Sequence, residues 1–585
     1  MFVTRLGHST FAEDLKMTRL QQMVVYTLSL SVLILAGSTV SPASQDASAL
    51  NSPSSVKPNF LFVVFEDMGP RIGAFGDAVA TTPVLDAFAA ESAQYANTFT
   101  TAGVCAPSRS SLITGVHQQT LGTQHMRTRS PLSLLSSGGP ISYDAVPPAD
   151  VKAFPELLRK AGYYTSNNGK TDYQFGEPFT VWDDQAAEHP WRGRPDNKPF
   201  FAMVNVLETH ESVIWPTDAF SMSPLVNIVR LRNLWTLSSK EEVTDPNNVD
   251  IPPYLPDTPV VRADIARHYD NIAFAEKQLA QLLDDLEADG LADNTIVIVT
   301  TDHGDGFPRM KRAIYDSGIK VPMMVRFPDG RDAGVKHDRL VSFVDLGPTF
   351  LNLAGVDVPG YVHGQPLFSQ TPAAPRDYIV AGSDRFDGTP EYQRAIRDER
   401  WKYIRNYRPD LPFFRHLNFR DQLPTMKELW RLHEESSLTP TQAQYFATPR
   451  PEEELYDTAT DPHEIQNLAA DPAHADTLTR LRAAYDAFTA STADLSSISE
   501  AEMIEAMWPD MQQPETAPVV FSVNGDSLSL TSATEGASIG YQHGENPVWH
   551  LYTGPFEIAP ATSVTAKAIR YGYAESTPTH FTQSQ

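Results

Sequence analysis

The chain contains one cysteine, Cys105, which begins the stretch Cys105-Ala106-Pro107-Ser108-Arg109. One cysteine cannot form an internal disulfide, so this thiol is either incidental or chemically used. A lone thiol is usually a small buried side chain. The chain continues through Ser110-Ser111-Leu112-Ile113-Thr114-Gly115, and the choice between the two interpretations depends on this whole stretch.

Three apolar runs each end in polar residues that could bind a ligand. The runs are 59–65, 200–207 and 295–301, and they are followed by Glu66-Asp67, Glu208-Thr209-His210 and Asp302-His303. Such runs are typical of buried strands in a parallel sheet, and helical patterns at 154–161 and 263–286 lie between them. The sequence therefore predicts an α/β fold with a mostly parallel sheet flanked by helices. In such sheets ligands bind beyond the carboxyl ends of the strands.

The stretch from Cys105 to Gly115 resembles the Cys-x-Pro-Ser-Arg-x-x-x-Leu-Thr-Gly motif of type I sulfatases, which belong to the alkaline phosphatase superfamily; here the motif ends in Leu112-Ile113-Thr114-Gly115. The resemblance covers about 57–468 and is to secreted bacterial glycan sulfatases. It implies that a maturation enzyme oxidises Cys105 to formylglycine. The hydrated aldehyde would attack sulfur with one oxygen, and loss of the proton on the other would expel sulfate.

The same resemblance implies one calcium ion beside residue 105. Its ligands would be Glu66, Asp67, Asp302 and His303, with Cys105 in its modified form, and the ion would polarise a sulfate oxygen. Two positions depart from the family pattern: Glu66 stands where Asp is commoner, and His303 stands where Asn is common. Imidazole is a poor calcium ligand, so His303 could instead form a hydrogen bond to the substrate or the nucleophile.

Sulfate also requires cationic donors. The resemblance implies that Arg109 stabilises the formylglycine hydrate and that Lys170 and Lys311 bind sulfate. It gives His210 contact with sulfate or protonation of the leaving oxygen. Taken singly, each lysine is more often a solvated surface charge, and His210 could be a core histidine. The interpretation therefore depends on the occurrence of all these residues in one chain.

One departure concerns the regeneration of the aldehyde. The family usually has histidine two residues after the first lysine, and this chain has Asp172 there. Either Asp172 or His125 could take that role, and the sequence does not choose between them. Three arginines are candidate contacts for an acidic sugar or a second sulfate: Arg127, Arg385 and Arg405.

Four segments are expected in the 585-residue chain: an export signal and leader at 1–44, a catalytic α/β domain at 57–368, a smaller α+β subdomain at 369–510 and a terminal β-sandwich at 515–585. The subdomain prediction depends on a hairpin pattern at 394–405 and a helix near 472–491. The β-sandwich is expected to be mainly structural. The start of the chain before Met17 could be a start-site error. The signal predicts export, either to the periplasm or out of the cell.

The formal net charge of −26 disfavours nucleic acid and anionic membranes as partners. No later run is long enough for stable membrane insertion. The leading hypothesis is therefore hydrolysis of sulfate esters on a sulfated glycan. One alternative is a formylglycine-dependent phosphodiesterase or phosphonate monoester hydrolase, and another is an inactive carbohydrate-binding homologue. The sugar, the sulfate position, exo or endo action and the oligomeric state are not specified by the sequence.

Overall fold

The computed structural model describes residues 57–129, 141–187, 189–216, 224–236, 240–369 and 374–583. The expected export signal at 1–44 lies outside these residues. Within the described part of the chain, no helix is both long and apolar enough to cross a membrane.

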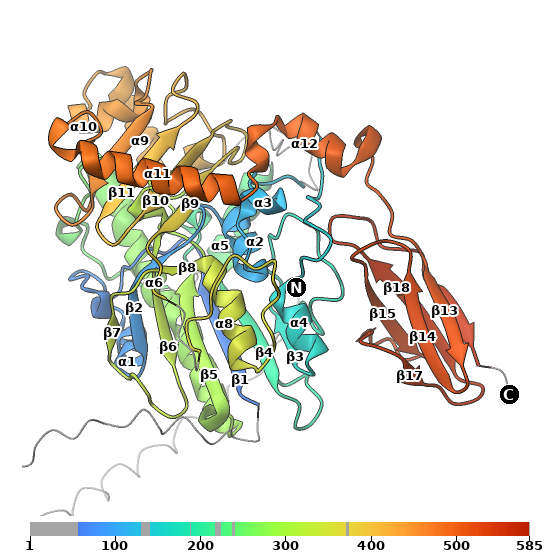
Figure 1. The fold of residues 1–585 in the computed structure, drawn as a ribbon. Coiled ribbons are helices and arrows are strands. Elements are labelled where there is room, and N and C mark those ends of the chain that lie inside the picture. Colours follow the sequence, from blue (N-terminus) through green and yellow to red (C-terminus); the bar gives the residue numbers. More distant parts are fainter. Residues whose placement is uncertain are drawn as a thin grey trace, which may run out of the picture. The chain divides into compact units, whose positions relative to one another are not determined.

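The central element is an eight-stranded, mostly parallel sheet (Figure 1). Strand β1 (Asn59–Phe65) lies between β4 (Phe200–Val206) and β5 (Thr295–Thr301), and it is parallel to both. Strand β3 (Tyr164–Asn167) is parallel to β4 at one edge. On the other side β6 (Lys320–Arg326) and β2 (Ala93–Phe99) introduce antiparallel pairs, and two short strands complete the sheet: β7 (Lys336–His337) and β8 (Val341–Ser342). The predicted sheet is confirmed.

Both faces of this sheet are buried because helices cover each of them. Alternate residues of β1 face opposite ways, so Phe60, Phe62 and Val64 belong to one core cluster and Leu61, Val63 and Phe65 to another. The first cluster includes side chains of α2 (Cys105–Thr114), α4 (Phe154–Lys160) and α8 (Leu346–Leu353). The second includes α1 (Pro83–Ala90) and α6 (Pro259–Ala288). This two-sided burial explains why the strands are continuous apolar runs.

A second, antiparallel sheet follows in the order β12-β11-β10-β9. Its strands are β9 (Ile379–Ser383), β10 (Gln393–Arg397), β11 (Trp401–Asn406) and β12 (Glu453–Asp457). Helix α11 (Ala475–Ser491) packs on one face through Leu478, Leu481 and Tyr485. The hairpin and helix predicted at 394–405 and 472–491 correspond to β10–β11 and α11. Further helices in this half of the chain are α9 (Pro424–Glu434), α10 (Pro440–Ala443) and α12 (Glu500–Met507).

The C-terminal residues form two small antiparallel sheets around a common apolar core. One contains β13 (Val519–Asn524), β14 (Ser527–Ser532) and β17 (Phe556–Glu557). The other contains β15 (Ser538–His543), β16 (His550–Leu551), β18 (Ser563–Ile569) and β19 (Thr579–Thr582). Two sheets that share one core form the β-sandwich that the alternating pattern predicted. The domain boundaries given above stay predictions.

Candidate active site

The register of the central sheet brings the three polar strand ends together. Phe65, the last residue of β1, pairs with Val206 of β4 and Thr301 of β5. The residues that follow these strands therefore emerge side by side. The backbone N–H of Asp302 donates to the carbonyl oxygen of Phe65 at 3.0 Å, and the N–H of Asp67 donates to Asp302 Oδ1 at 3.0 Å. Asp67 has φ 48°, a left-handed conformation that is uncommon outside glycine and recurs at functional sites.

Cys105 is the first residue of α2 and is buried. Its sulfur lies 3.2 Å from Glu66 Oε1, 3.3 Å from His303 Nε2 and 3.7 Å from Asp67 Oδ1. Burial raises the pKa of the thiol well above its usual value; Lys311 opposes the rise and Glu66 adds to it. The unmodified side chain is therefore a protonated thiol, which is a weak nucleophile.

Arg109 lies one helical turn after Cys105 and is also fully buried. Its guanidinium donates to Asn205 Oδ1 at 2.6 Å, to Glu66 Oε2 at 2.9 Å and to Asp302 Oδ2 at 3.1 Å. Two of these bonds fix carboxylates that surround Cys105, and the third fixes the amide of Asn205. Arg109 is thus a positioning residue in this structure.

Asp67 is held by a different set of cations. Lys311 Nζ lies 2.7 Å from Asp67 Oδ2 and 3.0 Å from Glu211 Oε1, and His303 Nε2 lies 3.0 Å from Asp67 Oδ1. Burial opposes ionisation of Asp67, but Lys311, His210 and His303 outweigh it and hold its pKa well below its usual value. Asp67 is therefore a carboxylate at neutral pH.

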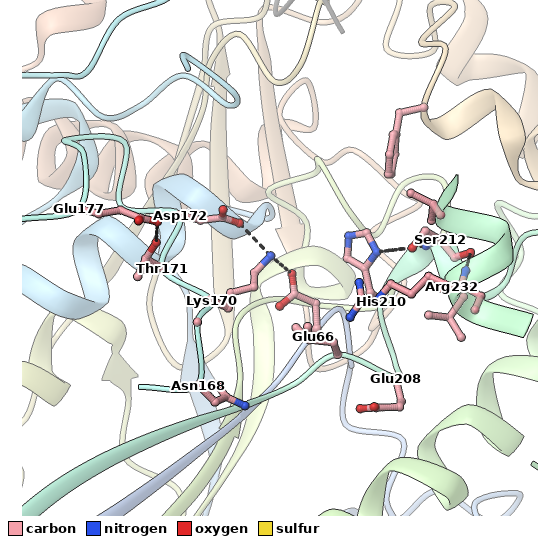
Figure 2. Close-up of a pocket in the computed structure, with 16 residues that line it drawn as sticks. Glu66, Asn168, Lys170, Thr171, Asp172, Glu177, Glu208, His210, Ser212 and Arg232 are labelled. Atoms are coloured by element: carbon pink, nitrogen blue, oxygen red, sulfur yellow. Dashed lines mark hydrogen bonds and ion pairs between the residues drawn. The ribbon is translucent and has the colours of Figure 1, made fainter. Parts of the chain in front are cut away.

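A cleft of about 540 Å³ opens beside these groups. Figure 2 shows Lys170 between Glu66 and Asp172, and His210 directed toward Ser212. Lys170 Nζ lies 2.6 Å from Glu66 Oε1 and 2.8 Å from Asp172 Oδ2. Burial and the neighbouring Lys311 lower the pKa of His210 to about 4, so its imidazole is neutral at neutral pH. The cleft therefore presents a cation and a neutral imidazole to an entering anion.

The donor set beside Cys105 fits a hard divalent cation. One group of ligand atoms within 4.8 Å of one another comes from Glu66, Asp67, Cys105 and His210, and a second comes from Asp67, Cys105, Asp302 and His303. Three buried carboxylates, those of Glu66, Asp67 and Asp302, supply half of these atoms, and carboxylate oxygens suit calcium. His303 contributes a nitrogen, and its Nδ1 is hydrogen-bonded to the Gly304 carbonyl oxygen at 2.9 Å.

The two candidates for the regenerating base lie in different surroundings. Asp172 lines the cleft, and although burial opposes its ionisation, Lys170 lowers its pKa to about 2. His125 does not line this cleft; its Nδ1 accepts a hydrogen bond from the backbone N–H of Arg385. Asp172 is linked to Cys105 through Lys170 and Glu66, so the geometry favours Asp172 over His125 as the base.

The three predicted sugar-binding arginines differ in position. Arg127 forms an ion pair with Asp387 at 2.7 Å and lies 4.2 Å from the ring centre of Phe419, which lines the cleft. Neither Arg385 nor Arg405 lines it. Arg385 is buried and paired with Glu500 at 2.6 Å, and Arg405 is paired with Asp486 at 2.9 Å. Sugar binding by Arg385 and Arg405 stays a prediction, and their ion pairs with Glu500 and Asp486 do not favour it.

Sequence reasoning missed three polar residues of the site. Asn205 accepts the hydrogen bond from Arg109, and its position inside an otherwise apolar strand was a signal. Glu211 follows His210 and pairs with both Lys311 and Arg312. Arg232 of α5 (Pro224–Thr236) lines the cleft (Figure 2) and is exposed, and no pattern in the sequence indicated it.

Comparison with known proteins agrees with this site. The family model "Sulfatase" matches residues 58–192 and 182–356, and the model "N-sulphoglucosamine sulphohydrolase, C-terminal" matches 307–444. The chain belongs to the sulfatase family, and it is a sulfuric ester hydrolase.

Two relatives and two solved structures illustrate the similarity. An "Ulvan-active sulfatase" of Formosa agariphila is 38% identical over 89% of this chain and 90% of its own length. The human N-sulphoglucosamine sulphohydrolase is 29% identical over 72% of this chain and 88% of its own length. A putative sulfatase from Bacteroides thetaiotaomicron (20% identity, TM-score 0.52, 76% of this chain and 94% of that one) and a 2-O GAG sulfatase (20%, 0.53, 76% and 94%) share the fold.

Proposed function

We propose that this sulfatase removes sulfate from a sulfated polysaccharide or oligosaccharide, using a formylglycine formed from Cys105 and one calcium ion. The observation that carries the proposal is the position of the Cys105 sulfur, which lies within 3.3 Å of Glu66 and His303 beside the cleft that Lys170 and His210 line. A protonated thiol among carboxylates is a poor nucleophile. The same position suits a formylglycine next to a bound calcium ion.

Formylglycine and calcium would supply part of the chemistry, and the other residues of the site would supply the rest. A hydrated formylglycine would supply the attacking oxygen and a second oxygen whose proton can be removed. Calcium would polarise the sulfate. Lys170 and Lys311 would hold the sulfate oxygens, and His210 would face the leaving oxygen. Asp172 would accept a proton near Lys170. Arg109 would keep Glu66 and Asp302 oriented throughout.

A glycan substrate is supported by the names of the relatives, which include ulvan-active and N-sulphoglucosamine enzymes. The open cleft of about 540 Å³ has room for more than a sulfate group, since pockets for small ligands measure about 300–1,000 Å³. We also propose export by the expected signal at 1–44, and maturation of Cys105 by a separate formylglycine-generating enzyme.

Turnover of chromogenic esters tests the proposal. The matured protein should hydrolyse an aryl sulfate faster than an aryl phosphodiester. Cys105→Ala should fold as the wild type does and show no turnover, because the nucleophile is lost. Mass spectrometry of the active protein should detect an aldehyde in place of the thiol of residue 105.

Three results would count against the proposal. Wild-type activity in Cys105→Ala would remove the formylglycine mechanism. Faster turnover of the phosphodiester would favour the alternative hydrolase. Absence of both activities in protein whose residue 105 is shown to be an aldehyde would favour an inactive binding homologue.

A further inference from the structure

A second cleft, of about 690 Å³, adjoins the catalytic one. The two clefts share Thr171, Asp172 and Glu177 as a common wall, in which the Thr171 hydroxyl donates to Glu177 Oε1 at 2.7 Å. Part of the second cleft comes from the C-terminal β-sandwich, which contributes Tyr573 and Glu575. The sandwich therefore borders a cleft that shares a wall with the catalytic cleft.

The two residues that precede Tyr573 in the chain pack closely against the catalytic core. The Tyr571 hydroxyl donates to Glu156 Oε2 at 2.7 Å, and its ring stacks on Phe175 with centres 5.0 Å apart. Gly572 follows with φ 83°, and a Cβ there would lie 2.2 Å from the carbonyl oxygen of Ala145. This close packing fixes the backbone that leads into Tyr573, so the wall of the cleft is preorganised.

The catalytic cleft is lined by four acidic side chains and two cations, Lys170 and Arg232, and the second cleft has one cation fewer. Its lining holds four acidic side chains and one arginine, Arg129. That arginine is already paired, at 2.8 Å with Asp144. Two further acids have cationic partners, since Asp172 pairs with Lys170 and Glu575 with Lys567. The fourth acid, Glu177, has no ion pair among the described residues.

This balance selects against anionic groups. A sulfate or carboxylate entering the second cleft would meet an excess of negative charge, because Arg129, the one cation among the described lining residues, is engaged with Asp144. Hydroxyl groups suit the same lining, because carboxylates and the side-chain amide oxygens of Gln174 and Gln513 can accept hydrogen bonds from them. Tyr573, which is half-buried, adds aromatic surface of the kind that packs on a sugar ring.

We propose that the second cleft binds an uncharged, hydroxyl-rich sugar unit of the same glycan whose sulfated unit occupies the catalytic cleft. The inference depends on the proposed glycan substrate, and it makes the β-sandwich a part of substrate recognition. It thus departs from the mainly structural role expected from the sequence. The enzyme would prefer a sulfated unit whose neighbour carries no sulfate or carboxylate.

Two variants of the intact protein test the cleft. Ala574→Trp fills it, and Tyr573→Ala removes its aromatic wall. Each should lower kcat/KM on sulfated oligosaccharides with a neutral neighbouring unit by about twofold to tenfold, the range of one aromatic contact, and leave aryl sulfate turnover unchanged. The matched controls are Ala559→Trp and Tyr552→Ala, which lie in the same sandwich but line neither cleft. Both controls should behave as wild type on both substrates.

Charge provides an independent test. Wild type should prefer an oligosaccharide with a neutral neighbouring unit to its carboxylated counterpart, and Glu575→Lys should reduce that preference. Equal kcat/KM for the two oligosaccharides in wild type, or oligosaccharide turnover untouched by Ala574→Trp, would overturn the inference. These results are distinct from failure of the proposed function, in which wild type would hydrolyse neither aryl sulfate nor any sulfated oligosaccharide.

Discussion

Replacement of Arg109 by lysine tests whether the buried guanidinium organises the site. Arg109 donates three hydrogen bonds of 2.6–3.1 Å, two of them to the carboxylates of Glu66 and Asp302, and its side chain has no exposed surface. Lysine keeps the charge but cannot reach both carboxylates and Asn205 with one ammonium group. The loss of one to two hydrogen bonds to charged groups should lower the free energy of unfolding by about 2–4 kcal/mol.

The assay is urea unfolding followed by tryptophan fluorescence, in buffer with chelator. Arg431→Lys is the matched control, because Arg431 also bridges two carboxylates, Glu428 at 2.8 Å and Glu435 at 2.7 Å, but does so in water. The control should unfold as wild type does, since exposed pairs contribute little. Arg109→Lys should also lose most aryl sulfate turnover, because two carboxylates beside residue 105 lose their orientation.

A third variant removes the charge itself. Arg109→Met leaves Glu66 and Asp302 without their buried cation, and such a break costs about 3–5 kcal/mol. Added calcium should restore part of this loss, because the ion would neutralise the same carboxylates. The reasoning fails if Arg109→Lys and Arg431→Lys unfold at the same urea concentration.

Three other predictions concern the metal, the base and the sandwich. Chelation should abolish turnover and calcium should restore it, because three buried carboxylates are among the donor groups. Asp172→Asn should lower turnover by at least about 100-fold, as expected for a general base, while His125→Gln should retain it because His125 lies outside the cleft. Truncation after Gln513 should lower thermal stability by exposing the surface that Tyr571 covers, and the folded remainder should keep aryl sulfate turnover.

For each of these predictions, one result would contradict it. Full activity in stringently metal-free protein would show that the carboxylates serve another purpose. Greater loss in His125→Gln than in Asp172→Asn would assign the base to the histidine. Loss of aryl sulfate turnover in a folded truncation would show that the sandwich supports the reacting centre itself.

The sequence predicted those features that depend on local pattern. The apolar runs at 59–65, 200–207 and 295–301 correspond to β1, β4 and β5, because strands buried on both faces carry few polar residues. Cys105 was identifiable because its motif is contiguous in the chain. Glu66 and Asp302 could be placed at one sheet edge, since they follow parallel strands.

Other features depend on contacts that no local pattern encodes. Arg109 was expected to act on the formylglycine, but its partners Glu66, Asn205 and Asp302 come from three different strand ends. Arg385 looked available for sugar, yet it is paired with Glu500, which lies 115 residues later in the chain. The second cleft escaped prediction for the same reason, because two segments about 400 residues apart form its walls.

The interface between the β-sandwich and the catalytic core limits how domains can be exchanged in the evolution of such proteins. At Gly536 and Gly572, both with positive φ, a Cβ would lie only 2.1 and 2.2 Å from the carbonyl oxygens of Ala149 and Ala145. Main chain therefore meets main chain at two points where no other residue fits. Recombination that exchanged this sandwich for an unrelated one would lose both close backbone contacts at once. The sandwich and core are expected to be inherited as a pair. A chimera should regain the close packing of this interface only when both glycines are restored.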